Sequence, residues 1–163
     1  MISEKMVRMI NDQIKAEFES EFLYLSMALW CSRKGYKGAL MWLLKQAAEE
    51  HEHAMKFIRY LDQVHADVEV PGIDKPNVEF NSLLDVFEKG LEHEKYISSR
   101  IFKLMETAEE EKDYFTADFL QWYVTEQLEE ETSFSSIVKK LKMVGDSKQG
   151  LMMIDAQLGQ RQE

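Results

Sequence analysis

Glu50 and His53 are the residues of this sequence whose types and spacing most clearly suggest chemistry, because Glu-x-x-His brings both side chains to one face of a helix. The rest of that face is apolar, with Trp42, Phe57 and Leu61. A carboxylate directed into a core costs several kcal/mol unless something compensates its charge. A cation bound by the carboxylate and the imidazole would do so, although a lone Glu-x-x-His also occurs on Glu-rich surface helices.

Similar polar interruptions occur in three other apolar stripes, and each lies near the middle of its expected helix. The interrupting residues are Glu17, Glu94, Gln127 and Glu130. Mid-height is the one level at which the helices of a bundle coincide, whichever way each helix runs. The sequence therefore predicts that these side chains meet Glu50 and His53 in one buried site.

The charges at this level indicate how many cations such a site would take. The four glutamates contribute four negative charges, which two divalent cations would neutralise while His53 binds as a neutral imidazole. Without cations, four carboxylates in one core could not all stay ionised. A site of oxygen ligands with one imidazole suits iron or manganese better than a metal that prefers thiolates.

Each of these residues, taken singly, also has a purely structural explanation. Glu17 would be a residue at the edge of the core, hydrogen-bonded to Tyr24. Gln127 would be a core amide with satisfied hydrogen bonds. Only the shared level of all the interruptions favours metal binding over these explanations.

Five helices are expected to position the site, over residues 4–34, 39–66, 82–110, 113–143 and 147–158. Ser3, Ser82 and Asp113 are suitable N-caps, and Gly35 and Gly145 are suitable stop signals. Only two prolines and seven glycines occur in the chain, as expected of long helices. We predict an all-α fold, a four-helix bundle with a short fifth C-terminal helix, in a single domain of residues 1–163.

The segment 67–81 carries both prolines and shows little helical periodicity. At about 3.3 Å per residue it reaches about 50 Å, whereas a helix of about 28 residues is about 42 Å long. It can therefore run the length of the bundle as one long crossover, which makes the third helix parallel to the second.

The composition excludes several classes of function. The 163 residues carry a net charge of −10, which repels phosphate-rich partners and attracts cations, so nucleic-acid binding is not expected. The single cysteine, Cys31, suits a reducing compartment. No signal-like N-terminal region and no apolar stretch of about twenty residues occurs. We therefore expect a cytoplasmic protein that does not enter a membrane.

A second acidic group, formed by Glu49, Glu126 and Glu129, lies beside the first on the expected helix faces. Such a group is usually a solvated surface, but next to a metal site an additional, weaker cation site is about equally expected. The other histidines fall off the inward stripes and are expected to face solvent. They are His51, His65 and His93.

Together, these residues resemble those of the ferritins, and in particular the bacterial non-haem ferritins. The resemblance covers nearly the whole chain, and the segment 119–127, Phe-Leu-Gln-Trp-Tyr-Val-Thr-Glu-Gln, is very similar to the fourth helix of that family. The motifs that carry the resemblance are Glu17 with Tyr24, Glu50-x-x-His53, Glu94, and Gln127-x-x-Glu130.

The resemblance implies a ferroxidase centre for two irons in each subunit. Glu17, Glu50 and His53 would surround one iron. Glu50 would bridge to a second iron, held by Glu94 and Glu130.

Further residues receive roles from the same resemblance. Gln127 would stand near the oxidant, and Tyr24 would donate a hydrogen bond at the edge of the centre. The third iron site of bacterial members is resembled by Glu49, Glu126 and Glu129, with Glu130 shared with the centre.

Iron storage is the function that the resemblance implies: oxidation of Fe(II) by O2 or H2O2, followed by deposition of ferric mineral inside a shell of twenty-four subunits. The short fifth helix would line the fourfold contacts. Haem is not expected, because His51 stands where bacterioferritins have their haem-binding Met. Animal ferritins line a threefold iron entry route with acidic residues, and Ala117 and Leu120 occupy those positions here.

Two other classes of function remain as alternatives. A di-iron peroxidase or oxidase would turn over substrate without storing iron, and a dimer instead of a large shell would favour it. A purely structural or signalling bundle would bind no less iron when Glu50 or His53 is replaced.

Overall fold

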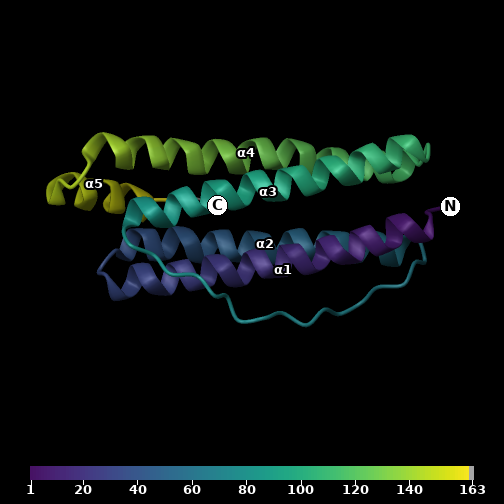
Figure 1. The fold of residues 1–163 in the computed structure, drawn as a ribbon, viewed down its shortest axis with the longest axis horizontal. Helices are drawn as coiled ribbons and strands as arrows, with labels where there is room; N and C mark the ends of the chain where they lie inside the picture. Colours follow the sequence, from purple (N-terminus) through teal and green to yellow (C-terminus); the bar gives the residue numbers. More distant parts are fainter. Residues whose placement is uncertain (162–163) are drawn as a thin grey trace.

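The computed structural model describes residues 1–161 and contains five helices. They are α1 (Glu4–Arg33), α2 (Lys37–Gln63), α3 (Leu83–Glu110), α4 (Tyr114–Val144) and α5 (Lys148–Leu158). Figure 1 shows four long helices side by side, with α5 at one end. The predicted all-α bundle is confirmed; residues 162–163 of the expected domain lie outside the described residues.

The helices pack as two antiparallel pairs, α1 with α2 and α3 with α4. Residues 67–82 form an extended crossover along the outside of the bundle, from the end of α2 to the opposite end, where α3 begins (Figure 1). Its start is anchored by Asn11, whose Nδ2 donates to the carbonyl of Asp67 and whose Oδ1 accepts from the amide of Glu69. The third helix therefore runs parallel to the second, as the length of the crossover predicted.

Side chains cap three of the long helices at their first turn. Ser3 accepts from the amide of Met6, and Ser82 accepts from that of Asp85. Asp113 accepts from an amide in the first turn of α4. These bonds satisfy amides that have no partner within a helix, so they fix where α1, α3 and α4 begin.

α2 ends at Gln63, three residues earlier than the sequence suggested. His65 adopts a left-handed conformation with φ of 57°, and the amide of Ala66 donates to the carbonyl of Leu61. This is the Schellman ending that glycine usually makes. No glycine marks the stop at this position, so the apolar periodicity alone placed the predicted boundary too late.

The interior contains two apolar clusters with a polar layer between them. One cluster includes Trp42, Phe87 and Phe134, and the other includes Ile14 and Phe57. The predicted polar interruptions are almost fully buried and share the intervening level; they are Glu17, Glu50, His53, Glu94, Gln127 and Glu130. The packing on both sides therefore leaves these side chains little freedom to turn away from one another.

α5 docks against the beginning of α2. Tyr36, which precedes α2, makes no side-chain cap, and instead the carboxylate of Asp155 in α5 accepts from the amides of Gly38 and Ala39. A Cβ at Gly38 would lie 1.7 Å from the carbonyl oxygen of Asp155, so only glycine permits this approach. None of the helices in residues 1–161 is long and apolar enough to cross a membrane.

Candidate metal centre

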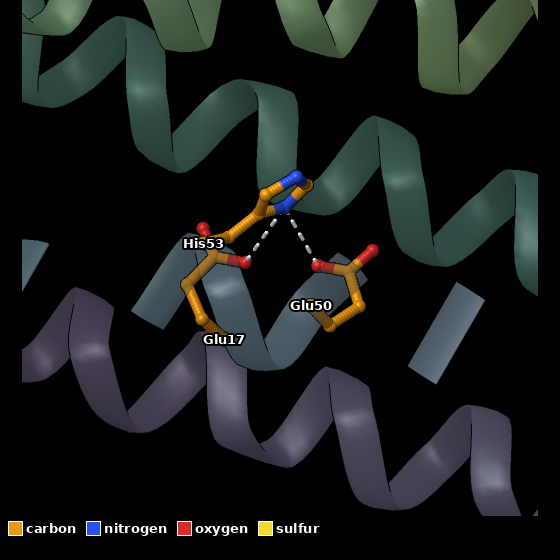
Figure 2. A group of neighbouring side chains, drawn as sticks. All are labelled: Glu17, Glu50 and His53. Atoms are coloured by element: carbon orange, nitrogen blue, oxygen red, sulfur yellow. Dashed lines mark hydrogen bonds and ion pairs between the residues drawn. The ribbon is translucent and has the colours of Figure 1, made fainter. Parts of the chain in front are cut away.

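Glu17 on α1 and the pair Glu50 and His53 on α2 form the first group of ligand atoms. One atom of each lies within 4.8 Å of the others. His53 Nδ1 is 3.1 Å from Glu50 Oε2 and 3.9 Å from Glu17 Oε2, and Figure 2 shows both carboxylates turned toward the ring. Glu17 Oε2 is buried and has no hydrogen-bond partner among the described residues. Such an oxygen fits a metal ligand, because an unsatisfied buried acceptor is costly.

Glu50, Glu94 and Glu130 form a second group, again with ligand atoms within 4.8 Å of one another. Glu50 belongs to both groups, so its two oxygens could serve two adjacent ions. The first group has an imidazole and the second has only carboxylates. Both donor sets suit iron, which accepts oxygen and imidazole ligands.

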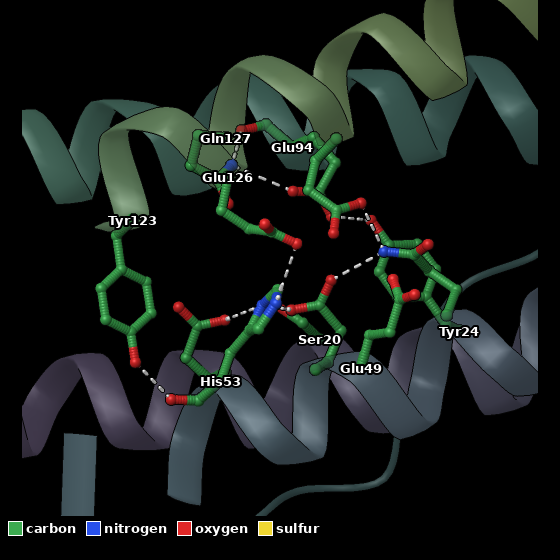
Figure 3. A network of polar contacts seen from close by, with 12 residues as sticks. Ser20, Tyr24, Glu49, His53, Glu94, Tyr123, Glu126 and Gln127 are labelled. Carbon is green, nitrogen blue, oxygen red and sulfur yellow. Dashed lines mark hydrogen bonds and ion pairs between the residues drawn. The ribbon is translucent and has the colours of Figure 1, made fainter. Parts of the chain in front are cut away.

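Tyr24 and Gln127 lie at the edge of the second group and fix Glu94. The Tyr24 hydroxyl donates to Glu94 Oε1. Gln127 Nε2 lies 3.1 Å from Glu94 Oε2 (Figure 3). It also lies 3.1 Å from Ser98 Oγ. The structure thus places the hydrogen bond of Tyr24 on Glu94 and not on Glu17, which was its partner in the purely structural explanation.

The electrostatics of the site show the cost of crowding these carboxylates. Burial, followed by the charge of Glu94, raises the pKa of Glu50 well above its ordinary value. The same two causes raise the pKa of Glu130 to about 8. Burial alone would lower the pKa of His53, but Glu50 and Glu126 beside it raise it well above its ordinary value. Without a cation the site holds protons, and a bound cation would displace them.

Of the second acidic group, Glu49, Glu126 and Glu129, only Glu126 lies close to the ligands of the centre. Glu126 Oε1 lies 3.6 Å from His53 Nε2, and these two residues with Glu130 form a third group of ligand atoms. Glu49 is half-exposed and pairs with the guanidinium of Arg161 at 2.9 Å. Glu129 is exposed and belongs to none of the ligand groups found in the described residues.

His93 corrects one expectation. It was expected to face solvent, but it is only partly exposed, and its Nε2 lies 2.7 Å from Ser20 Oγ. Burial lowers the pKa of His93 to about 4, so the ring is neutral. The other two histidines outside the centre, His51 and His65, are exposed.

Two glutamines that touch the centre were not identified from the sequence. Gln13 and Gln46 are almost fully buried, and each stands four residues before a ligand glutamate, Glu17 or Glu50. The repeated Gln-x-x-x-Glu spacing was the available signal. It was overlooked because a buried amide on an inward-facing stripe is usually a core residue whose hydrogen bonds are satisfied.

A surface pocket of about 390 Å³ reaches the centre from the side of α2 and α4. Its lining includes His53 and Trp122, with Glu49, Glu52 and Glu126 around them. Acidic residues at this opening raise the local concentration of cations. The pocket is therefore a suitable approach for a divalent metal.

Comparison with known proteins places this geometry in a family. Residues 7–144 match the ferritin-like domain. The bacterial non-heme ferritin of Campylobacter jejuni is 44% identical over 155 residues, covering 95% of this chain and 93% of that protein. The bacterial non-heme ferritin of Staphylococcus aureus is 32% identical over 161 residues, covering 99% and 97%.

The fold agrees equally well with a solved structure. An open-pore ferritin from the hyperthermophilic archaeon Archaeoglobus fulgidus superimposes with a TM-score of 0.98 at 44% identity, covering 99% of this chain and 100% of that one. Sequence and architecture thus agree over almost the full length, and this chain belongs to the ferritin family.

Proposed function

We propose that this protein is a ferroxidase that stores iron: it oxidises Fe(II) at the buried centre and deposits ferric mineral inside a protein shell. The observation that carries the proposal is the convergence of four carboxylates and one imidazole, from four helices, in overlapping groups of ligand atoms. Membership of the ferritin family supports the same function.

In the proposed reaction two Fe(II) ions bind as substrates, the first near Glu17, Glu50 and His53 and the second near Glu50, Glu94 and Glu130. Gln127 and Tyr24 keep Glu94 oriented through their hydrogen bonds. Hard carboxylate ligands stabilise Fe(III) over Fe(II) and so favour loss of an electron. The two electrons of the pair reduce O2 to H2O2, or H2O2 to water.

Glu126, Glu49 and Glu129 would form a third iron site beside the pair, sharing Glu130. The contact between Glu126 and His53 supports a link between this site and the centre. The ion pair of Glu49 with Arg161 means that iron would have to displace the guanidinium before Glu49 could bind it.

We further propose that residues 1–163 act as a single ferritin-like domain and assemble into a cytoplasmic shell of twenty-four subunits without haem. Similarity to ferritins over almost the full chain supports this assembly. The storage function depends on it, because the mineral needs an enclosed volume.

Aerobic oxidation of added Fe(II), followed by the near-ultraviolet absorbance of the ferric product, tests the function. The parent protein should show a fast phase that saturates at two Fe(II) per subunit. Glu50→Ala and Glu17→Ala should slow this phase by about 10- to 100-fold, because each removes a ligand. Glu19→Ala is the matched control, since Glu19 is exposed on the same helix as Glu17.

Equal fast phases in the parent and both ligand variants would overturn the assignment of the centre. The native mass and iron content of the same samples separate storage from the alternative. A dimer with no retained iron would favour a di-iron peroxidase or oxidase, whereas a large iron-loaded particle supports storage.

A further inference from the structure

Gln13 and Gln46 occupy equivalent positions beside the centre, one on α1 and one on α2. Gln13 Nε2 lies 3.0 Å from Glu17 Oε1, and Gln46 Nε2 lies 3.0 Å from Glu50 Oε1. In both ligand glutamates the other oxygen, Oε2, faces His53 Nδ1. Each glutamine therefore holds one oxygen of its glutamate, and the carboxylate is turned so that its second oxygen faces the ring of His53.

The far side of Gln13 is held by an arginine from α3. Arg100 Nε donates to Gln13 Oε1 at 2.8 Å, and a second guanidinium nitrogen donates to the hydroxyl of Tyr96. Two successive hydrogen bonds therefore connect the guanidinium, through the amide, to the carboxylate of Glu17. Arg100 itself does not reach the centre.

The far side of Gln46 is held in the same way by a residue beyond α5. Arg161 donates to Gln46 Oε1 at 3.1 Å, to the carbonyl of Trp42 at 2.9 Å and to Glu49 Oε2 at 2.9 Å. Gln46 Nε2 also lies 2.7 Å from Glu130 Oε2. One arginine from the C-terminal segment thus acts, through a single amide, on carboxylates of both α2 and α4.

An arginine is suited to this position because its guanidinium has only donors. An amide facing it must present the carbonyl oxygen, so the NH2 group must face the carboxylate. A free glutamine could flip and present its oxygen instead, and that oxygen could not donate to the carboxylate. With its NH2 group held in place, each amide donates to Oε1 of its glutamate and so sets the orientation of that carboxylate.

We propose that Arg100 and Arg161 are positioning residues for the metal centre: through Gln13 and Gln46 they fix the direction of two amides and thereby hold the carboxylates of the ligand glutamates in one orientation. The inference rests on the proposed function, because it assigns to these residues a role in binding the substrate metal. It also links the docking of the C-terminal segment to the centre, since Arg161 lies three residues beyond the end of α5 at Leu158.

Anaerobic titration with Co(II), a redox-inactive probe of Fe(II) sites, tests the proposal on the full-length assembled protein. Arg161→Met and Arg100→Met should each weaken Co(II) binding by about tenfold and alter the visible ligand-field spectrum of the bound ion. Arg59→Met is the matched control, because Arg59 is exposed and pairs with the exposed Glu52. It should leave both readouts unchanged.

A double-mutant cycle separates action through the amide from a general structural effect. If Arg161 acts through Gln46, then Arg161→Met should have no further effect in a protein that already carries Gln46→Met. The same holds for Arg100 with Gln13. Arg161→Lys, which keeps the charge but not the fork of donors, should recover part of the affinity.

Parent-like binding in both arginine variants, or fully additive effects in the double variants, would overturn the proposal while leaving the ferroxidase function intact. A different result would show that the proposed function itself is wrong: Glu50→Ala would bind Co(II) as tightly as the parent does. In that case Co(II) does not bind at the centre that contains Glu50, and the role proposed for the arginines is wrong as well.

Discussion

At the scale of single residues, the centre is a set of groups that oppose the stability of the fold. Glu17, Glu50, Glu94 and Glu130 are each at most 4% exposed, and burial, followed by the charges of Glu94 and Glu17, raises the pKa of Glu50 beside them. Such groups are retained because they bind a ligand, although they lower the stability of the folded state when the ligand is absent. The raised pKa values are the direct expression of that cost.

Glu130 gives a pH prediction whose sign follows from its pKa. Burial and Glu94 raise that pKa from 4.5 to about 8, so the folded protein binds this proton more tightly than the unfolded chain. The stabilisation is complete below the unfolded pKa of 4.5 and is lost as the pH rises through about 8. We expect the thermal unfolding midpoint of metal-free protein to fall across this range.

Glu130→Gln isolates that contribution, because the amide oxygen can still accept from Gln46. The variant should show a weaker loss of stability with pH than the parent, by calorimetry at several pH values. Saturating Co(II) should instead make the parent the more stable of the two proteins at high pH, since only its carboxylate binds the ion. Parallel pH profiles for parent and variant would contradict this account of Glu130.

At the scale of elements, the helices are positioned by a few close approaches. A Cβ at Gly90 on α3 would lie 2.3 Å from a ring carbon of Phe134 on α4, so glycine sets the spacing of that pair. Gly38 does the same for α2 and α5. α5 has only eleven residues and would not be stable alone, so its position depends on such docking.

Gly38→Ala should therefore undock α5, because the added Cβ meets backbone that cannot move aside. Overpacking of this kind typically costs about 1–3 kcal/mol. We expect a lower thermal midpoint and faster proteolytic cleavage within residues 145–161. Gly72→Ala is the control, since a Cβ there meets no atom within 4 Å. If α5 stays protected in Gly38→Ala, the close approach of Gly38 to Asp155 does not control the docking of α5.

At the scale of the whole molecule, a single subunit leaves apolar surface uncovered. Phe22, Leu25 and Leu29 on α1 are 38%, 40% and 50% exposed and share one face of the helix. A stripe of this kind is typical of a surface that meets another subunit. It supports the proposed assembly without deciding the number of subunits.

Leu29→Arg should disrupt that assembly, because a buried, unpaired charge would be introduced into an interface. The parent should sediment as a particle of twenty-four chains of 19.2 kDa, whereas the variant should sediment as a much smaller species. Leu29→Met keeps the apolar character and should leave the mass unchanged. A variant with parental mass would exclude this stripe from the subunit contacts.

The sequence by itself determined the all-α fold, the long crossover and the level of the centre. Period-3.6 apolar stripes identify helices, and a charged residue on such a stripe is too costly to be accidental in four helices at once. These features are local, or follow from the length of a segment, so they can be read without coordinates. The early end of α2 was not predicted, because His65 adopts a left-handed conformation that glycine usually adopts.

Only the tertiary structure decided which partners surround the centre. Arg100 and Arg161 stand 87 and 115 residues from the glutamines they hold, and no periodicity connects positions so far apart. The same is true of the partial burial of His93 against Ser20. Helical spacing fixes which side chains share a face, but the packing of one helix on another decides what that face meets.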